Sequence, residues 1–212
     1  LDEASGGIPV LSIVPKLEQW RRRDQAVLET VENPQSAVSE SYRSLRSALD
    51  FASLDHKISL VHLTSSNAGE GKTTTAANLA VTIARADRRV ILVDCDLRRP
   101  RLHEFFRLDN DQGFTSVLLG ECSVQDALQR PEHVPNLLVL TSGPPPPNPS
   151  ELLSTKAAEE LLTALTQPAD MVIVDSPPLL PVSDAAILAR YAHSTLLVVT
   201  ASSTTRRSLG RS

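Results

Sequence analysis

Residues 58–75 read ISLVHLTSSNAGEGKTTT, an apolar run followed by a glycine-rich turn and a stretch that favours helix. Gly69 and Gly71 can adopt positive φ, which lets backbone N–H groups close around phosphate oxygens. A helix that begins near Gly71 adds the positive end of its dipole. A strand, a glycine-rich loop ending in Gly-Lys-Thr and a helix together predict a loop that binds the phosphates of a nucleotide.

The residues of this loop that we expect to contact the nucleotide are Asn67, Ala68, Gly69, Glu70, Gly71, Lys72, Thr73 and Thr74. Lys72 would bridge the β- and γ-phosphates of ATP, and the Thr73 hydroxyl would ligate Mg²⁺. Ser66 stands where the usual pattern has its first glycine. Because Glu70 is an acid in an anion-binding loop, we expect its side chain to point outward. A plain strand-to-helix turn is the alternative, and the intact Gly-Lys-Thr end argues against it.

Two further apolar runs end in carboxylates. One runs through Val90 to Asp94 and continues to Asp96, and the other runs from Met171 to Asp175. An acid at a strand end is often a turn former or a helix cap, but several acids beside a phosphate loop need a cation, and Mg²⁺–ATP carries one. We therefore expect Thr73, Asp96 and Asp175 to hold the metal. Arg98 and Arg99 could pair with these acids or contact phosphate, and the sequence leaves both open.

The spacing of apolar runs predicts an α/β fold of the phosphate-loop NTPase type: a single domain with a mostly parallel sheet and helices on both faces. The expected strands are 58–64, 89–94, 136–141, 171–175 and 194–200. Between them we expect helices at 71–86, around 125–129, at 149–166 and at 183–191. An amphipathic helix precedes the first strand over 37–53, with its apolar residues at steps of three and four.

The segment 1–36 is expected to be a docking segment or linker, and residues 37–212 form the predicted domain. Within the first segment, Ile8–Pro15 is interpreted as an edge strand or a docking segment, because its prolines exclude a central strand position. Residue 1 is Leu, and the chain stops soon after a strand-like run. Both ends are therefore expected to be cut from something longer.

Composition excludes several classes of function. Lys and Arg number 21 against 25 Asp and Glu, a net charge of −4, so we expect no bulk electrostatic binding to nucleic acid. The chain has 2 cysteines, too few for a disulfide framework or a zinc site. Apolar runs are far shorter than the ~20 residues of a membrane span. His62, His103 and His133 lack metal-ligand spacing and are interpreted as structural or surface residues.

The combined motifs resemble the bacterial tyrosine kinases of capsule and exopolysaccharide biosynthesis. The resemblance covers nearly the whole chain and is carried by Ile8–Leu11, Glu40–Arg46, the loop ending Gly69–Thr73, Asn78–Ala80, Asp94–Pro100, Gly143–Leu153, Asp175–Pro178 and Leu180–Ala185. The stretch with Asp94, Asp96 and Arg98 resembles the additional Walker A′ motif of that family. Ordinary phosphate-loop proteins lack this motif.

The resemblance implies an autophosphorylating kinase that transfers the γ-phosphoryl group of ATP to tyrosine, with ATP and Mg²⁺ as cofactors. The implied catalytic residues are Lys72, Asp94 and Asp96. Asp94 is the candidate to accept the tyrosine proton, and an exchange of roles with Asp96 stays open. Glu40, Arg43 and Arg46 match the E-x-x-R-x-x-R oligomerisation motif of the family. From composition alone they are an exposed helix face with one ion pair.

The family also implies partners and a location. We expect a homo-oligomer on the cytoplasmic side of the bacterial plasma membrane. The expected partners are tyrosine-containing protein substrates and a membrane chain-length-determinant protein, fused or separate, that activates the kinase and thereby controls polysaccharide polymerisation and export. The Ile8–Pro15 segment resembles the stretch that follows the last membrane span in fused versions.

The sequence departs from the family at its C-terminal end. Only Tyr42 and Tyr191 are tyrosines, both in predicted helices, whereas the family carries a C-terminal tyrosine cluster. We expect the family's last strand and helix to be missing, and the acceptor tyrosine is left open. Two alternatives remain. A partition or division-site ATPase shares the loop but has a signature lysine where this chain has Asn67, and a non-catalytic module would bind nucleotide only to order an interface.

Overall fold

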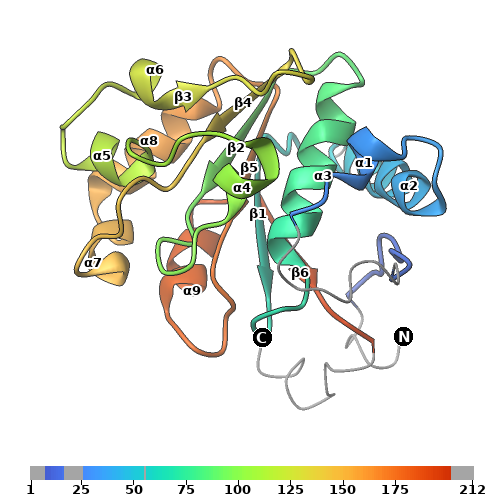
Figure 1. Ribbon diagram of the computed structural model, residues 1–212. Coiled ribbons are helices and arrows are strands. Elements are labelled where there is room, and N and C mark those ends of the chain that lie inside the picture. Colours follow the sequence, from blue (N-terminus) through green and yellow to red (C-terminus); the bar gives the residue numbers. More distant parts are fainter. Residues whose placement is uncertain (1–7, 17–25, 55, 202–212) are drawn as a thin grey trace.

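In the computed structural model, which describes residues 8–16, 26–54 and 56–201, strands form a six-stranded sheet in the order β3-β4-β2-β5-β1-β6 (Figure 1). All neighbouring strands are parallel except β3, which pairs antiparallel with β4. The mostly parallel α/β sheet is thereby confirmed. The strands are β1 (Leu60–Ser65), β2 (Val90–Asp94), β3 (Leu128–Gln129), β4 (Leu137–Leu140), β5 (Met171–Asp175) and β6 (Ser194–Val198).

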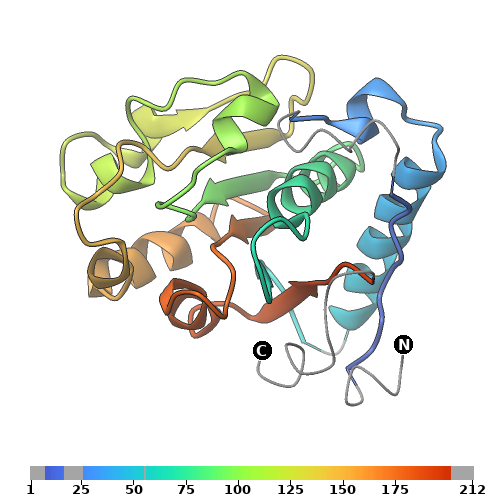
Figure 2. The same cartoon turned by 60° about the horizontal axis from the view of Figure 1, so that its bottom comes forward.

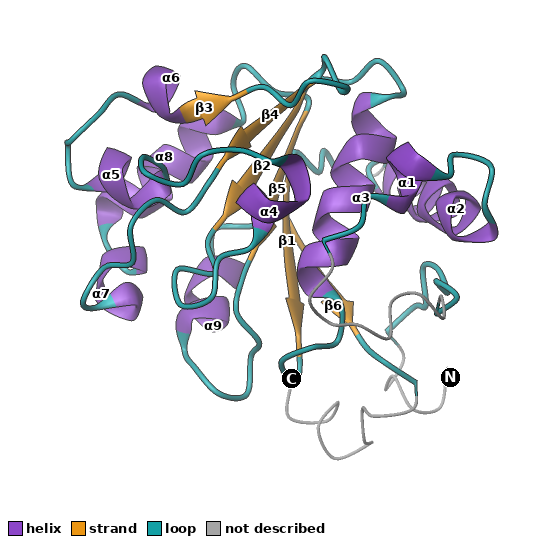
Figure 3. Ribbon diagram, in the orientation of Figure 1, coloured by secondary structure: helices purple, strands orange, loops and turns teal. Residues whose placement is uncertain are grey.

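Helices cover both faces of the sheet, as Figures 2 and 3 show. One face carries α1 (Glu29–Glu32), α2 (Ala37–Ala52), α3 (Lys72–Ala84) and α4 (Leu102–Phe106). The other face carries α5 (Phe114–Leu118), α6 (Val124–Ala127), α7 (Pro149–Leu153), α8 (Lys156–Leu165) and α9 (Asp184–Ala189). None of the helices in the described part of the chain is long and apolar enough to span a membrane.

Two apolar clusters hold the layers together, one on each face. In β5, Met171 and Ile173 enter the cluster under α2 and α3, whereas Val172 and Val174 enter the cluster under α8. Successive side chains of a strand point to opposite faces, so a strand covered on both sides must be apolar at every position. This explains why the strand segments are continuous apolar runs.

Helix α2 follows the predicted stripe closely. Ser36 accepts a hydrogen bond from the Ser39 N–H and caps the helix. Val38, Tyr42 and Leu49 are then buried against the first cluster. The amphipathic helix is confirmed in position and in the face that it buries.

Several expected elements are corrected. The single helix predicted over 149–166 is wrong, because α7 ends at Leu153 and the Thr155 hydroxyl caps a new helix, α8, by accepting from the Ala158 N–H. The helix predicted around 125–129 ends at Ala127, and Leu128 pairs with Leu140 across the sheet. Helices α1, α4 and α5 were not predicted, because a helix of one turn is too short for its apolar residues to show a helical period.

The N-terminal segment that the structure describes forms no strand. The Ser12 hydroxyl donates to the Ser41 carbonyl of α2 at 2.8 Å, while Leu11 and Val14 pack against the first cluster. The docking alternative therefore fits this segment, and the edge-strand alternative is wrong. Helix α1, inside the expected linker, also packs: Thr30 donates from its N–H and its hydroxyl to Asn78 of α3, both at 3.0 Å. The boundary at residue 36 stays a prediction.

Candidate functional site

The glycine-rich loop joins β1 to α3. Gly69 has a φ of 80° and Gly71 a φ of 94°, both in the left-handed region that favours glycine. Gly71 precedes the first helical residue, Lys72, and caps α3 without a side-chain hydrogen bond. The first N–H groups of this 13-residue helix are therefore presented at the loop, which is the arrangement that binds phosphate at helix N-termini.

The side chain of Glu70 turns back onto the loop. Its Oε2 accepts a hydrogen bond from the Asn67 N–H at 2.9 Å, and the residue is only 8% exposed. The expectation that this carboxylate points outward is wrong. A carboxylate three residues after a turn can accept a hydrogen bond from the first N–H of that turn, and this local bond is favoured over hydration of the carboxylate.

Strands β2 and β5 end side by side, and each ends in a buried carboxylate. The register pairs Asp94 with Asp175, and the Cys95 N–H donates to the Asp175 carbonyl at 2.9 Å. Asp96 follows two residues after Asp94 and is 6% exposed. The carboxyl edge of a parallel sheet, where strand order lets neighbouring loops diverge, is where α/β proteins bind ligands. The structure brings the predicted acids together at this edge.

Asp94 is fully buried and organises the chain that follows β2. Its Oδ2 accepts from the N–H groups of Arg101 and Leu102 at 3.1 and 3.0 Å, and its Oδ1 accepts from the Asp96 N–H at 3.2 Å. Burial raises the pKa of Asp94 well above its ordinary value, and the neighbouring Asp175 carboxyl adds to the rise. Both oxygens are thus engaged with backbone.

Asp175 is equally buried but lacks such donors. Neither of its carboxylate oxygens accepts a hydrogen bond of ordinary geometry from the residues that the structure describes, although the Thr73 hydroxyl and the Ser176 N–H lie near enough to lower its pKa. Burial raises the pKa of Asp175, while the Lys72 ammonium and the Thr73 hydroxyl oppose that rise. A buried, unpartnered carboxylate beside a hydroxyl is the oxygen donor set that suits Mg²⁺. The residues present therefore fit the metal that the sequence implies.

Asp96 lies near enough to Lys72 of the phosphate loop for the two charges to interact. Burial raises the pKa of its carboxyl, and the nearby Lys72 ammonium pulls it down in part. The Asp96 Oδ1 accepts from the Arg99 N–H at 3.1 Å, so the side chain caps the turn that it begins. Lys72 itself is 7% exposed and acts electrostatically on both Asp96 and Asp175. The charge of one ammonium thus acts on two acids.

Arg98 pairs with an acid other than the strand-end acids that the sequence offered as its partners. Its Nε and Nη2 donate to the two oxygens of Asp184 at 2.8 and 3.1 Å. The Ser150 hydroxyl donates to Asp184 Oδ1 at 2.5 Å. Sequence reasoning assigned no role to Asp184 or Ser150. Asp184 lies in a segment that resembles the family, but nothing in the local sequence links it to Arg98, 86 positions earlier.

Comparisons with known proteins agree with this geometry. A family model described as an AAA domain matches residues 55–207. The tyrosine-protein kinase YwqD of Bacillus subtilis is 48% identical over 171 residues, which are 81% of this chain and 72% of YwqD. The kinase domain of the Escherichia coli tyrosine kinase ETK superposes with a TM-score of 0.91 at 32% identity, covering 97% of this chain and 84% of that one. The chain belongs to the bacterial tyrosine kinases.

Family members differ in length around this domain. The tyrosine-protein kinase wzc of Salmonella typhimurium is 35% identical over 204 residues, which are 91% of this chain but 28% of wzc. The division-site alternative is not favoured, since the Pyrococcus furiosus cell division ATPase MinD superposes with a TM-score of 0.58 over 66% of this chain. The phosphate-loop fold and the kinase relatives together imply that the site binds a nucleotide.

Both tyrosines of this bacterial tyrosine kinase chain are engaged in the fold. Tyr42 is 1% exposed within the first cluster, and burial raises its pKa. The Tyr191 hydroxyl donates to the Leu153 carbonyl at 3.1 Å, and its ring packs against the second cluster. Neither side chain is presented as an acceptor at the carboxyl edge of the sheet.

Glu40, Arg43 and Arg46 lie together on α2 and not among the acids of the sheet edge. Arg43 pairs with Glu40 at 2.6 Å and also donates to the Pro34 carbonyl at 2.8 Å. Arg46 comes within 4.0 Å of Asp50. The face is exposed and charged, which suits a contact between copies and equally suits a solvated helix.

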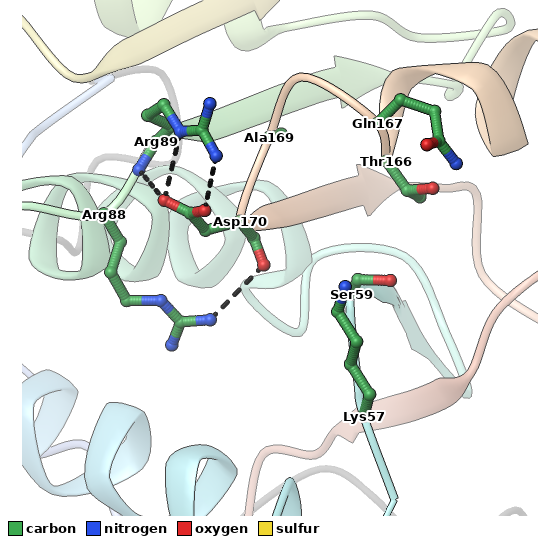
Figure 4. Close-up of a pocket in the computed structure, with 8 residues that line it drawn as sticks. All are labelled: Lys57, Ser59, Arg88, Arg89, Thr166, Gln167, Ala169 and Asp170. Carbon is green, nitrogen blue, oxygen red and sulfur yellow. Dashed lines mark hydrogen bonds and ion pairs between the residues drawn. The ribbon is translucent and has the colours of Figure 1, made fainter.

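Residues outside this edge have structural roles. His62 is fully buried, lies 2.7 Å from the Ser176 hydroxyl, and has its pKa lowered by burial to about 4. A cavity of about 570 Å³ lies at the amino ends of the strands, opposite the acids, and is drawn in Figure 4. Arg88 and Arg89 at its rim pair with Asp50 and Asp170 at 2.5 and 2.8 Å, so their charges are neutralised there.

Proposed function

We propose that this chain transfers the γ-phosphoryl group of ATP to the hydroxyl of a protein tyrosine. The observation that carries the proposal is the unpartnered, buried carboxylate of Asp175 beside Lys72 and Thr73. A phosphate loop alone supports many hydrolases and switches. Here a second acidic strand end, with Asp96, lies next to it, and the relatives with this combination are named tyrosine-protein kinases.

Phosphoryl transfer depends on positioning and on neutralising charge. The N–H groups of the loop and of the first turn of α3 would hold the β- and γ-phosphates. Lys72 would neutralise the oxygens between them. Mg²⁺, held by Thr73, Asp96 and Asp175, would supply further charge neutralisation on the same phosphates. Each residue works from a fixed element: a helix start, a strand end or the turn after one.

The acceptor tyrosine must lose a proton as its oxygen bonds to phosphorus. The bond from the γ-phosphorus to the bridging oxygen breaks, ADP leaves with that oxygen, and the tyrosine proton passes to a carboxylate. Asp94 has both oxygens engaged with backbone N–H groups and no exposed surface. We therefore assign proton acceptance to the Asp96 carboxylate oxygen that does not hold Mg²⁺, with Asp94 holding the loop that carries Asp96. This takes the exchange of roles that the sequence left open.

The acceptor is proposed to come from a tyrosine other than Tyr42 or Tyr191. Tyr42 could reach the site only if α2 left the core, and Tyr191 is bonded to the Leu153 carbonyl. Phosphorylation would then act on a tyrosine outside these 212 residues. We further propose that the chain assembles through Glu40, Arg43 and Arg46, on the cytoplasmic side of the membrane with a chain-length-determinant partner, and regulates capsule or exopolysaccharide export.

The test is direct phosphotransfer. The purified chain is incubated with Mg²⁺ and γ-labelled ATP, with and without a tyrosine-rich acceptor peptide and an activating membrane-protein segment. Lys72→Met is the inactive variant. Lys57→Met is the matched control, because Lys57 lies at the amino ends of the strands, at the end of the sheet away from the phosphate loop. We expect label on peptide tyrosine in the unmodified chain and in Lys57→Met, and none in Lys72→Met.

Two other results would overturn the proposal. Release of inorganic phosphate without label on tyrosine, with the activator present, would indicate an ATPase. Binding of ATP that depends on Lys72 but yields neither phosphate nor label, with the activator present, would indicate a nucleotide-gated assembly module.

A further inference from the structure

A buried ion pair at the carboxyl edge has no role in the chemistry described so far. Asp184 begins α9 and is completely buried, whereas the Arg98 side chain is 39% exposed. Two of the three Arg98 guanidinium nitrogens, Nε and Nη2, each donate to one of the two Asp184 carboxylate oxygens, which is the bidentate geometry. Arg98 Nη2 also donates to the Ser150 hydroxyl at 3.0 Å. We refer to Arg98, Asp184 and Ser150 as the clamp.

The clamp ties together three loops that leave neighbouring strands. Arg98 lies in the segment after β2, Ser150 lies in α7 after the chain that leaves β4, and Asp184 follows the segment after β5. Strands β4, β2 and β5 are adjacent in the sheet. One carboxylate therefore accepts from both of the other loops at the edge where the nucleotide is proposed to bind. A bidentate pair that is closed by a hydroxyl fixes direction as well as distance.

The segment held by Arg98 is also the one that aims Asp96. Asp96 opens a turn in which the Arg99 N–H donates to the Asp96 carbonyl at 3.2 Å and to its Oδ1 at 3.1 Å. Leu97 and Arg98 are the two residues inside this turn. Because this hydrogen bond from the turn holds one oxygen of the Asp96 carboxylate, anchoring Arg98 anchors the direction of that carboxylate.

We propose that Asp184, acting through Arg98, is a positioning residue that holds Asp96 in the orientation required by the Mg²⁺–nucleotide complex. The inference rests on the proposed function of the site. Residues one contact removed from a metal ligand typically change metal affinity about 10–100-fold when they are replaced. Nucleotide bound without metal depends on the loop and Lys72 instead, so the clamp should leave it unchanged.

The experiment measures binding and needs no turnover. A fluorescent non-hydrolysable ATP analogue is titrated into the folded chain in EDTA, and then at increasing Mg²⁺. Asp184→Asn keeps the shape of the side chain and removes its charge. Mg²⁺ is expected to increase the affinity for the analogue. In Asp184→Asn we expect the Mg²⁺ concentration that gives half of this increase to rise about 10-fold, and the affinity in EDTA to change less than about twofold.

A second variant protects the test against misfolding. Removing one partner of a buried pair leaves an unpaired charge, whereas Arg98→Gln with Asp184→Asn leaves none. The double variant should show the same rise as Asp184→Asn and not the sum of two effects. Glu104→Gln is the control, because it breaks the Arg101–Glu104 pair of 2.9 Å in the next turn of the same segment. It should behave like the unmodified chain.

The outcomes separate the two proposals. An unmodified chain that binds the analogue with no response to Mg²⁺ would overturn the proposed function. A normal response in the unmodified chain that is shared by Asp184→Asn and by the double variant would overturn the clamp. Equal loss of affinity in EDTA and in Mg²⁺ would also overturn it, since the clamp would then be a purely structural support.

Discussion

Replacing Asp175 by Asn should change how the stability of the ligand-free chain responds to pH. In the folded chain burial raises the pKa of Asp175 from an ordinary 3.8 to about 7. The folded state therefore keeps a proton that the unfolded state has already lost. Under this linkage the free energy of unfolding falls as pH rises from about 4 to about 7, and Asn removes that part of the fall.

The magnitude follows from the two pKa values. Their difference corresponds to about 4 kcal/mol at 1.36 kcal/mol for each tenfold change, over the whole range. Of this loss of unfolding free energy, about 2–3 kcal/mol falls between about pH 5 and about pH 8. Asp94 lies next to Asp175 in the register, and after burial the Asp175 carboxylate is the main cause that raises the pKa of Asp94. Replacing Asp175 by Asn therefore also lowers the pKa of Asp94.

The assay is urea denaturation followed by far-ultraviolet circular dichroism at both pH values. The quantity compared is the change in unfolding free energy from pH 5 to pH 8, in the unmodified chain and in Asp175→Asn. A buried amide without partners costs stability, but that cost is the same at both pH values and cancels. The lowered pKa of His62, about 4, makes the folded chain gain stability with rising pH, and this too is common to both chains.

Asp170→Asn is the control. Hydrogen bonds from Arg89 lower the pKa of Asp170 to about 2, so its contribution changes below pH 4 and leaves the measured interval alone. The reasoning would be refuted if Asp175→Asn kept the full pH dependence of the unmodified chain. It would also be refuted if Asp170→Asn reduced that dependence as strongly.

Two further perturbations test the fold and the assembly. A Cβ at Gly113 would lie 2.2 Å from the Thr141 carbonyl oxygen, so Gly113→Ala should lower stability by about 1–3 kcal/mol in thermal unfolding, and an unchanged melting temperature would contradict this close approach. Arg43→Glu with Arg46→Glu should convert assemblies into monomers by light scattering, because it reverses the exposed charge of α2; equal mass at equal concentration would exclude this surface from the contact.

Much of the site is visible in local sequence because its parts are local. The phosphate loop needs Gly69, Gly71 and Lys72 within a few residues of a strand end, and each has a backbone or charge reason that is independent of the rest of the fold. Buried parallel strands must be apolar at successive positions, so β2 and β5 appear as runs ending in Asp94 and Asp175. The amphipathic stripe of α2 follows from helical periodicity in the same way.

Predictions from the sequence were wrong where two local conformations differ only slightly in free energy. Thr155 can continue a helix or cap a new one, and the cap forms. The Glu70 carboxylate can face water or the Asn67 N–H, and it takes the N–H. Each of these choices is worth about 1 kcal/mol, which lies below what pattern reasoning can resolve.

Strand order and long-range pairing were decided only by the tertiary structure. The sheet places β5 between β1 and β2, which sets Asp175 next to the loop and beside Asp94. The same packing brings Asp184 to Arg98 across 86 residues of sequence. Sequence determines which segments are strands and which carry charge, because those properties depend on neighbours along the chain. Which segments meet depends on how two apolar faces are covered at once, and that is a property of the whole fold.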